Sequence, residues 1–388
     1  MSTSHQHPAG SIAKPAGEHQ PRVLILPPSY FAHDRTVGGG ERYALEYARA
    51  LAELTPTTLA LFGSEASTQC DGTLDIRTYR LRRFDQRLSL PITWPIWRDL
   101  ERFDVLHAMV FPTPITDALL LSARWRHQTL VLTDVGGGGP CWSIYLQRLH
   151  PRLNLNRLAH GLALLSRHAA QLFADWAQPK EILYGGADLN RFAAADHPLE
   201  GYALFVGRLL LHKGALQLVQ AVSPNTPLRM IGRPYDAAYF AQLQAAAQGK
   251  KVTFILEADD AELQRQYAGA SVVLQPSLPL DTPGVDTSEL LGLVTLEAMA
   301  SGKPVIVTRT ASLPELVREG ETGFIVPPND PAALRSALEK LVAQPQLSLQ
   351  MGAAARRHVE GNFTWSQVAQ RGLSFYRRLS QAHSGVTP

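Results

Sequence analysis

Short apolar runs alternate with amphipathic stretches along most of the chain. A short apolar run that ends at turn residues is typical of a buried strand, and apolar positions three and four apart are typical of a helix. We expect strands at residues 22–27, 57–62, 103–109, 128–133, 162–166, 202–206, 228–232, 252–256, 271–275, 304–307 and 324–326. We expect helices at residues 41–54, 167–176, 293–300, 331–342 and 363–379, and one that begins near Gly214. This alternation predicts an α/β fold with parallel sheets covered by helices.

One break in the alternation divides the chain. With 388 residues the chain is long enough for two domains. The segment AAADHP at residues 193–198 interrupts the periodic pattern. We therefore expect a disordered tail at residues 1–20, a Rossmann-like domain at 21–195, a second Rossmann-like domain at 196–362 and a last helical segment at 363–388.

Composition argues against several classes of function. Apolar residues make up 45% of the chain and charged residues 18%, with a formal net charge of +3. No basic stripe with interleaved aromatic residues stands out, so nucleic acid is not an expected partner. Cys70 and Cys141 lie far apart, which indicates reduced thiols rather than a zinc site. The amino-terminal residues lack the apolar core of a signal peptide and no apolar run has membrane-spanning length, so we expect a cytoplasmic protein.

The stretch TSELLGLVTLEAMASGKPVIV, residues 287–307, has the pattern of a loop, a helix and a buried strand. In an open parallel sheet, a ligand binds where the carboxyl end of a strand meets the first turn of the next helix, and the amides there attract phosphate. We expect residues 292–294 to offer those amides. Glu289 and Glu297 can then contact different parts of one elongated ligand, such as a nucleotide sugar. The alternative is that Glu289 is a first-turn acid favoured by the helix dipole and that Glu297 is a solvated helix residue.

A second phosphate-binding element is predicted on a loop with two cations. The loop connects the expected strand at 202–206 to the helix near Gly214, and it carries Arg208 and Lys213. Two cations beside a helix amino end suit a diphosphate, because they offset its charge and stabilise it as a leaving group. On their own, an arginine and a lysine on a loop are more often solvated.

Together these two elements resemble a known family. SELLGLVTLEAMASGKPVI, residues 288–306, is similar to the Glu-x7-Glu signature of the group 1 retaining glycosyltransferases, and GRLLLHKG, residues 207–214, is similar to their Gly-Arg-x4-Lys-Gly element. The resemblance covers roughly residues 20–380. It implies the GT-B fold, in which two Rossmann-like domains face each other across a cleft and the last helix returns to the first domain. It also implies that the domain at 21–195 binds the acceptor and the domain at 196–362 binds the nucleotide-sugar donor.

The resemblance implies roles for single residues as well. Arg208 and Lys213 would hold the diphosphate, Glu297 would accept the ribose hydroxyls, and Glu289 would orient the sugar and oppose positive charge on its ring. Leu291 stands where relatives commonly carry an aromatic residue. The implied catalytic residues are Glu289, His107, Arg208 and Lys213. The implied donor-binding residues are Gly39, Gly40, Gly207, Arg208, Lys213, Gly232, Glu289, Leu291, Gly292, Leu293, Val294 and Glu297.

Two implied elements in the first domain have an alternative interpretation. FDVLHAM at residues 103–109 resembles the Asp-Val-x-His strand end of the family, which implies that His107 reaches the cleft and contacts the transferred sugar or a backbone group. A lone histidine on a strand is more often a core residue with satisfied hydrogen bonds. Gly39 and Gly40 resemble the family's Gly-Gly-x-Glu segment near the donor phosphates, although a tight turn between strand and helix needs glycine too.

The acceptor is expected to contact the segment after the strand at 128–133. Relatives carry His-Asp near this strand end, where Thr133 and Asp134 stand here, and four glycines follow at residues 136–139. Because loops of this kind carry binding residues, we expect contacts with the acceptor rather than chemistry. The expected acceptor-binding residues are Asp134, Gly136 and Trp142.

Residues 77–98 combine several arginines with Trp94 and Trp97. This composition suits an anionic membrane surface, and several enzymes of the group 1 family act on membrane-bound acceptors. The alternative is a solvated connection between strand and helix that carries ordinary surface charge. Peripheral contact with the inner face of a membrane is therefore one of two interpretations of this segment.

The function implied by the resemblance is transfer of a sugar from a nucleoside-diphosphate sugar to a glycan, lipid-linked or small-molecule hydroxyl, with retention at the anomeric carbon. No cofactor is expected beyond the donor, and no metal is required because Arg208 and Lys213 can neutralise the diphosphate. A nucleotide-sugar epimerase or sugar phosphorylase of the same plan stays open, as does a catalytically silent nucleotide-sugar-binding or scaffold protein. A dinucleotide dehydrogenase is not expected, because no GxGxxG follows the first strand.

Overall fold

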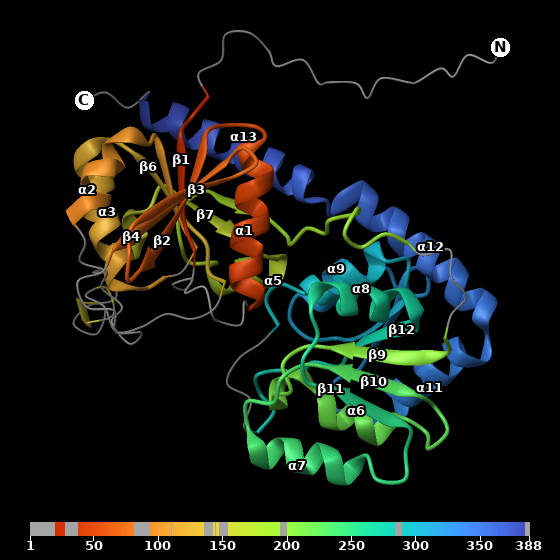
Figure 1. Cartoon of the computed structure of the whole chain (residues 1–388). Coiled ribbons are helices and arrows are strands. Elements are labelled where there is room, and N and C mark those ends of the chain that lie inside the picture. The colour runs from red at the N-terminus through yellow and green to blue at the C-terminus, as the bar shows by residue number, and fades with distance from the viewer. Residues whose placement is uncertain are drawn as a thin grey trace, which may run out of the picture.

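The computed structural model describes residues 20–27, 38–80, 94–109, 111–135, 143, 145–146, 154–194, 200–283 and 289–384. Within these ranges the chain forms two mainly parallel sheets, each flanked by helices (Figure 1). We call residues 20–194 the first half and residues 200–362 the second half. The described strands of the first half form an eight-stranded sheet and those of the second half a six-stranded sheet. The predicted α/β fold class with two Rossmann-like units is confirmed.

The sheet of the first half has the strand order β3-β4-β2-β1-β5-β6-β7-β8. Its strands are β1 (Val23–Leu26), β2 (Thr57–Gly63), β3 (Ser67–Asp71), β4 (Leu74–Arg80), β5 (Val105–Ala108), β6 (Thr129–Leu132), β7 (Gly161–Leu164) and β8 (Lys180–Ile182). The neighbours are parallel except for β3 and β4, which form an antiparallel hairpin at one edge. The expectation that residues 77–80 lie in a connection was wrong, because they pair with β2 as part of β4.

Helix α1 (Gly39–Ala52) covers one face of this sheet. Its buried residues recur at three- and four-residue spacing, so they lie on one side of the helix and enter the core. They are Tyr43, Ala44, Tyr47, Ala48, Leu51 and Ala52. The other helices described in this half are α2 (Trp94–Asp99), α3 (Pro114–Arg126) and α5 (Arg167–Leu172).

The sheet of the second half has the order β11-β10-β9-β12-β13-β14, with all neighbours parallel. Its strands are β9 (Tyr202–Val206), β10 (Leu228–Ile231), β11 (Val252–Ile255), β12 (Ala270–Gln275), β13 (Val305–Thr308) and β14 (Gly323–Val326). Within this half the order is 3-2-1-4-5-6, which is the doubly wound arrangement. The order reverses between β9 and β12. Ligands of such sheets bind at the carboxyl ends of the strands beside this switch point.

Seven helices are described around the second sheet. They are α6 (Ala215–Ala221), α7 (Ala237–Ala246), α8 (Asp260–Gly269), α9 (Leu293–Ala300), α10 (Leu313–Leu316), α11 (Pro331–Ala343) and α12 (Pro345–Asn362). Helix α9 has the bounds expected from the sequence. It is apolar nearly all round because α12, α10 and the sheet enclose it.

The last helix, α13 (Trp365–Ser384), leaves the second half and packs along α1 and β6 of the first half (Figure 1). Its apolar side chains enter the same core as those of α1. The hydroxyl oxygen of Tyr376 on α13 lies 2.7 Å from that of Tyr47 on α1, and both rings are fully buried. The prediction that the last helix returns to the first domain is confirmed.

The two halves also meet through a carboxylate. Glu315 on α10 accepts hydrogen bonds from the backbone N–H groups of Arg167 and His168, at 2.8 and 2.7 Å, in the first turn of α5. The hydroxyl of Tyr184 donates to the same carboxylate at 2.8 Å. A negative charge is favourable at the amino end of a helix, where N–H groups lack intrahelical partners. This contact fixes α10 of the second half against the first half.

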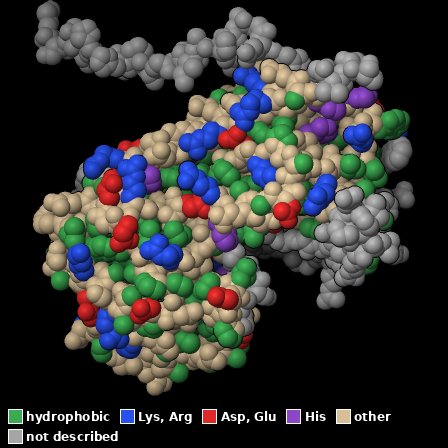
Figure 2. All heavy atoms as spheres, turned by 180° about the vertical axis from the view of Figure 1, so that it is seen from behind, with side chains coloured by type: hydrophobic (Ala, Val, Ile, Leu, Met, Phe, Trp, Pro, Cys, Tyr) green, Lys and Arg blue, Asp and Glu red, His purple; other side chains and the backbone are tan. Residues whose placement is uncertain are grey.

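Basic and acidic side chains are interspersed over the described part of the face shown in Figure 2. Among the residues that the structure describes, no helix combines the length and the apolar character needed to cross a membrane.

Candidate functional site

A pocket of about 760 Å³ lies between the two halves. Its walls come from the residues that follow β9, β10 and β11, from the first turn of α1 and from the start of α9. The pocket therefore lies at the carboxyl ends of the parallel strands, beside the switch point of the second sheet. A doubly wound sheet binds its ligand at this place. Two helix amino ends, those of α1 and α9, border the same space and favour a negatively charged ligand.

The pocket gathers seven of the expected donor-binding residues. They are Gly39, Gly207, Arg208, Gly232, Leu293, Val294 and Glu297. The other five lie beside the pocket. Gly40 follows Gly39 in α1, and Leu291 and Gly292 precede α9. Lys213 and Glu289 lie on neighbouring loops and form an ion pair. Residues from both halves and from four separate loops thus meet in one place.

The loops after β9 and β10 approach each other closely. A methyl group added to Gly232 would collide with the carbonyl oxygen of Gly207, so these two loops pack backbone to backbone. Arg208 follows directly and is exposed at the pocket, with its Cζ atom 5.9 Å from the ring centre of Tyr235. The close packing leaves the guanidinium of Arg208 available to a ligand.

Gly292 begins α9 in a left-handed conformation, with a φ of 60°. An L side chain seldom adopts this conformation, and a methyl group here would collide with Leu316 of α10. The turn brings the backbone N–H of Gly292 to 3.4 Å from the Oε1 atom of Glu289, which folds back over the helix start. Glycine is thus required at the point where the predicted phosphate-binding turn forms.

Lys213 and Glu289 form an ion pair across two loops of the second half. Their side chains are 17% and 10% exposed, so the pair is largely shielded from water. Burial alone would raise the pKa of Glu289, but the Lys213 ammonium and the Gly292 amide outweigh it and hold the pKa below its usual value. Glu289 is therefore an ionised carboxylate at neutral pH, next to the pocket.

Glu297 lies in the pocket wall and is 4% exposed. Its Oε1 atom accepts a hydrogen bond from Nη1 of Arg42 at 2.9 Å, and its Oε2 atom accepts one from the Tyr267 hydroxyl at 3.0 Å. Arg42 belongs to α1 of the first half, and 255 residues separate it from Glu297. It was not predicted as a site residue, because the chain pattern places it on a helix and does not reveal a partner so distant.

The Arg42 side chain continues into a wider charged cluster. Its Nη2 atom lies 3.7 Å from Oδ1 of Asp260, at the start of α8. The same oxygen lies 2.5 Å from Nη2 of Arg191. Asp260 is 64% exposed in its side chain, so these outer contacts are weaker than the buried pair of Arg42 with Glu297. The cluster links the two halves along one side of the pocket.

His107 lies inside the first sheet, where β5 pairs with β1 and β6. It is fully buried, and both ring nitrogens are engaged: Nδ1 lies 2.6 Å from the Tyr376 hydroxyl and Nε2 lies 2.7 Å from the Thr133 hydroxyl. Burial lowers its pKa to about 3, so the ring is neutral at physiological pH. The structure places His107 as a core residue with satisfied hydrogen bonds, away from the pocket that gathers the donor residues.

The expected acceptor residues are described only in part. Asp134 is partly buried just beyond β6. Gly136 and Trp142 lie outside the described residues, as do residues 81–93 of the basic segment. Within its described part, Arg77 pairs with Asp75 and Asp99 at 2.7 and 3.3 Å.

Within the described ranges, no three His, Cys, Asp or Glu side chains are grouped so that they could hold a metal ion.

Comparisons with known proteins agree with this geometry. Residues 190–358 match the family model of the glycosyl transferases group 1. A stretch of 185 residues is 36% identical to the D-inositol 3-phosphate glycosyltransferase of Corynebacterium diphtheriae, covering 44% of this chain and 41% of that protein. The chain spans 41% to 50% of the length of the curated relatives it matches.

Solved structures resemble the chain over nearly its whole length. Sucrose-phosphate synthase from Thermosynechococcus elongatus superimposes with a TM-score of 0.73 at 20% identity, covering 93% of this chain and 100% of that chain. Anabaena HepE in complex with UDP and glucose gives a TM-score of 0.70 at 18% identity, covering 93% and 100%. At such identities the likeness establishes the fold. The chain therefore has the GT-B fold, and its residues 190–358 are similar to the glycosyl transferases group 1 family.

Proposed function

We propose that this protein is a retaining glycosyltransferase that moves a sugar from a nucleoside-diphosphate sugar to an acceptor hydroxyl. The observation that carries the proposal is the pocket at the switch point of the second sheet, which combines Arg208, the start of α9 and the buried carboxylate Glu297. An elongated anionic ligand with hydroxyl groups fits this combination. The family match at residues 190–358 supports the same chemistry.

The diphosphate is assigned to the cations and the helix start. Arg208 is exposed at the pocket, and Lys213 follows on the same loop with one hydrogen directed to Glu289. An ammonium group has three hydrogens, so Lys213 can keep this contact and still donate to a phosphate oxygen. The amides at the start of α9 add a favourable dipole. As the bond to the sugar breaks, negative charge grows on the diphosphate, and these groups stabilise it without a metal ion.

The ribose is assigned to Glu297. Each carboxylate oxygen has two lone pairs, so both can accept from ribose hydroxyls while they hold Arg42 and Tyr267. Arg42 holds the buried carboxylate in place through its hydrogen bond. Because Arg42 comes from the first half, it also makes the ribose site dependent on the approach of the two halves.

The transferred sugar is assigned to the space next to Glu289. Its carboxylate stays ionised because of Lys213, so it can accept from sugar hydroxyls and oppose positive charge on the ring. Retention then follows a single-face path in which the leaving phosphate oxygen takes the acceptor proton. No side chain in this region is assigned as a covalent nucleophile.

A uridine diphosphate hexose is the first donor to test, because HepE of Anabaena was solved with UDP-glucose. The acceptor is assigned to the domain at 21–195, with Asp134, Gly136 and Trp142 as its contacts, and the donor to the domain at 196–362. The acceptor class stays a glycan, a lipid-linked sugar or a small-molecule hydroxyl. Peripheral contact of the segment at residues 77–98 with an anionic membrane on the cytoplasmic side is part of the proposal, and sedimentation with anionic vesicles at low salt tests it.

The decisive experiment combines binding with turnover. UDP, GDP and ADP sugars are screened for an increase in melting temperature, since a ligand that binds the folded state raises it. The stabilising donor is then incubated with candidate acceptors, and the anomeric configuration of the product is read by NMR. Stabilisation without turnover in any acceptor mixture would favour a silent nucleotide-sugar-binding protein, and no stabilisation by any donor would contradict the proposal.

A further inference from the structure

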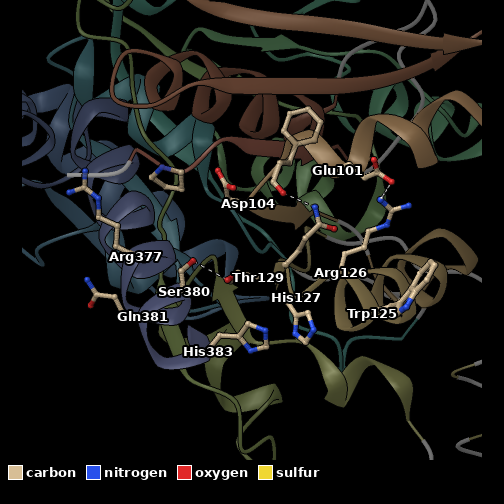
Figure 3. A pocket seen from close by; sticks show the side chains of 13 residues that line it. Glu101, Asp104, Trp125, Arg126, His127, Thr129, Arg377, Ser380, Gln381 and His383 are labelled. Carbon is tan, nitrogen blue, oxygen red and sulfur yellow. Dashed lines mark hydrogen bonds and ion pairs between the residues drawn. The ribbon is translucent and has the colours of Figure 1, made fainter. Parts of the chain in front are cut away.

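We propose that the first half carries a second binding site, specific for a neutral oligosaccharide, at the amino ends of its parallel strands. A pocket of about 930 Å³ opens there between α3 and α13 (Figure 3). Its floor is made by the residues that precede β1, β5 and β6, whereas the donor pocket borders the opposite, carboxyl edge. The volume is within the roughly 300–1,000 Å³ of small-molecule sites. This site goes beyond the proposed transfer reaction and does not depend on it.

The charges in the walls of this pocket are balanced. Two acids, Glu101 and Asp104, and two arginines, Arg126 and Arg377, line it. The Oδ1 and Oδ2 atoms of Asp104 accept from Arg22 at 3.1 and 3.2 Å, and Glu101 lies 2.7 Å from Nη1 of Arg126. Because the charges of these two acids and two arginines sum to zero, the wall attracts neither a strong anion nor a strong cation. It does offer many hydrogen-bonding groups, which suits an uncharged polyhydroxy ligand.

One buried acceptor in the floor has no partner among the residues that the structure describes. Gln128 is 5% exposed, and both hydrogens of its amide donate to backbone carbonyls, to Leu100 at 2.5 Å and to Phe103 at 2.6 Å. Its Oε1 atom has no hydrogen-bond partner among the described residues, and neither has the buried Nε of Arg126. A buried polar atom without a partner is unfavourable, so a hydroxyl that donates to Oε1 would be bound selectively.

An exposed aromatic ring stands at the rim of the pocket (Figure 3). Trp125 is 81% exposed, which is unusual for so large an apolar side chain. Arg126 holds its Cζ atom 5.9 Å from the ring centre. A sugar ring has one face of C–H groups that can pack on an indole while its hydroxyls form hydrogen bonds. Trp125 and the polar floor therefore supply both kinds of contact that a saccharide requires.

The backbone at the end of α3 brings these groups together. His127 has a φ of 54°, in the left-handed region, at a position where helices more often end with glycine. Through this sharp turn, all five consecutive residues 125–129 line the pocket. On the facing wall, the hydroxyl oxygen of Ser380 on α13 lies 2.9 Å from that of Thr129. A glycan held between these walls would be retained on the enzyme without entering the donor pocket.

The test uses the full chain and three defined probes: maltotetraose, cellotetraose and an α-1,2-linked mannotetraose. Saturation-transfer NMR detects binding, and calorimetric titration measures the Kd. At least one probe should bind, and Trp125→Ala should weaken that binding by about tenfold or more, as expected for the loss of one packed ring. Leu121→Ala is the matched control, because Leu121 is also exposed on α3, one turn earlier, at 49%.

Further controls separate this site from the donor pocket. Lys213→Ala should leave the affinity for the saccharide unchanged, and Trp125→Ala should leave the affinity for UDP unchanged. Gln128→Met, of similar size, should weaken binding through loss of the Oε1 acceptor. The proposal is overturned if none of the three probes binds, if Trp125→Ala binds like the wild type, or if Lys213→Ala abolishes saccharide binding. Preferential binding of inorganic phosphate, measured in the same way, would also overturn it.

Discussion

Each half of the molecule holds a buried polar cluster near the switch point of its sheet, and the two clusters differ in character. In the second half, Lys213 and Glu289 are a charged pair beside the pocket. In the first half, His107 is neutral and bonded on both sides to hydroxyl groups inside the core. A charge can act on a ligand only where a ligand can reach it. We therefore expect the electrostatics of the proposed reaction to lie in the second half, and we expect His107 to contribute to stability.

We expect the largest effect, a loss of kcat, from Lys213→Ala. This variant tests the charged pair of the second half. Loss of one group that stabilises transition-state charge reduces kcat by about 100- to 1,000-fold. It also leaves Glu289 buried without its partner, which raises the pKa of that carboxyl. Steady-state kinetics with the stabilising donor measure the loss. Lys251→Ala, at an exposed lysine of the same half, is the control and should keep wild-type activity. Equal activity of both variants would contradict the proposed diphosphate site.

The next largest effect is expected in the free energy of unfolding, which should depend on pH through His107 of the first half. Because the pKa of His107 in the folded state is about 3, below the ordinary 6.5, the unfolded chain binds a proton that the folded chain does not. The stabilisation is therefore present above pH 6.5 and is lost as the pH falls toward 3. The free energy of unfolding should fall by about 1.4 kcal/mol per pH unit from this group between roughly pH 6 and pH 4.

Urea titrations at several pH values measure that slope. In His107→Gln this slope should be smaller by the contribution of one proton. His160, whose pKa is lowered by burial to about 4, is present in both proteins and contributes equally to both slopes. Donor binding at pH 7.5 should be retained in this variant. An unchanged slope together with a lost transfer activity would reverse the comparison and make His107 a catalytic residue.

A third test compares two glycines of equal conformation. Gly292 and Gly72 both have a φ of 60°, but a methyl group would collide with Leu316 at Gly292 and would meet nothing within 4 Å at Gly72. Gly292→Ala should reduce the free energy of unfolding by about 2–3 kcal/mol and Gly72→Ala by about 1 kcal/mol. Thermal unfolding with and without donor measures both. Similar losses would show that backbone strain, rather than packing at the start of α9, makes Gly292 necessary.

The smallest expected effect comes from Arg42→Ala, which tests whether the first half contributes to the donor site. Removing the partner of Glu297 should weaken UDP binding by about tenfold, through the loss of one charge-assisted hydrogen bond. Arg49→Ala is the control on the same helix, because Arg49 pairs with Glu46 and Asp71 away from the pocket. Calorimetric titration with UDP measures both. If the two variants bind UDP equally, the donor site belongs to the second half alone.

Much of the fold could be predicted because its signals are local. The bounds of β9 and α9 follow from short apolar runs that end at glycine, and they agree with the structure. The β3–β4 hairpin was missed because charged residues at 77–80 obscured the alternation of a half-buried strand. Several helices, among them α3 and α12, were not predicted from the pattern alone.

The candidate site was predictable where one motif holds several groups and not where the fold brings distant residues together. Gly292 and Glu297 lie on one turn and one helix, so their spacing in the chain determines their spacing in space. The partner of Glu297 is Arg42, which is 255 residues away. His107 is enclosed by Tyr376, 269 residues away. Contacts at such separations depend on the docking of whole elements, and a single sequence carries no local signal for them.

Helix α13 has a consequence for how the protein is made. The core of the first half includes Phe375, Tyr376 and Leu379, which follow the whole second half in the chain. The first half is thus synthesised early but stays incomplete until the second half and α13 have been synthesised as well. During that interval the faces of α1 and β6 that α13 will cover are exposed to water. Newly made chains should therefore be protease-sensitive in their amino-terminal part until the final helix emerges.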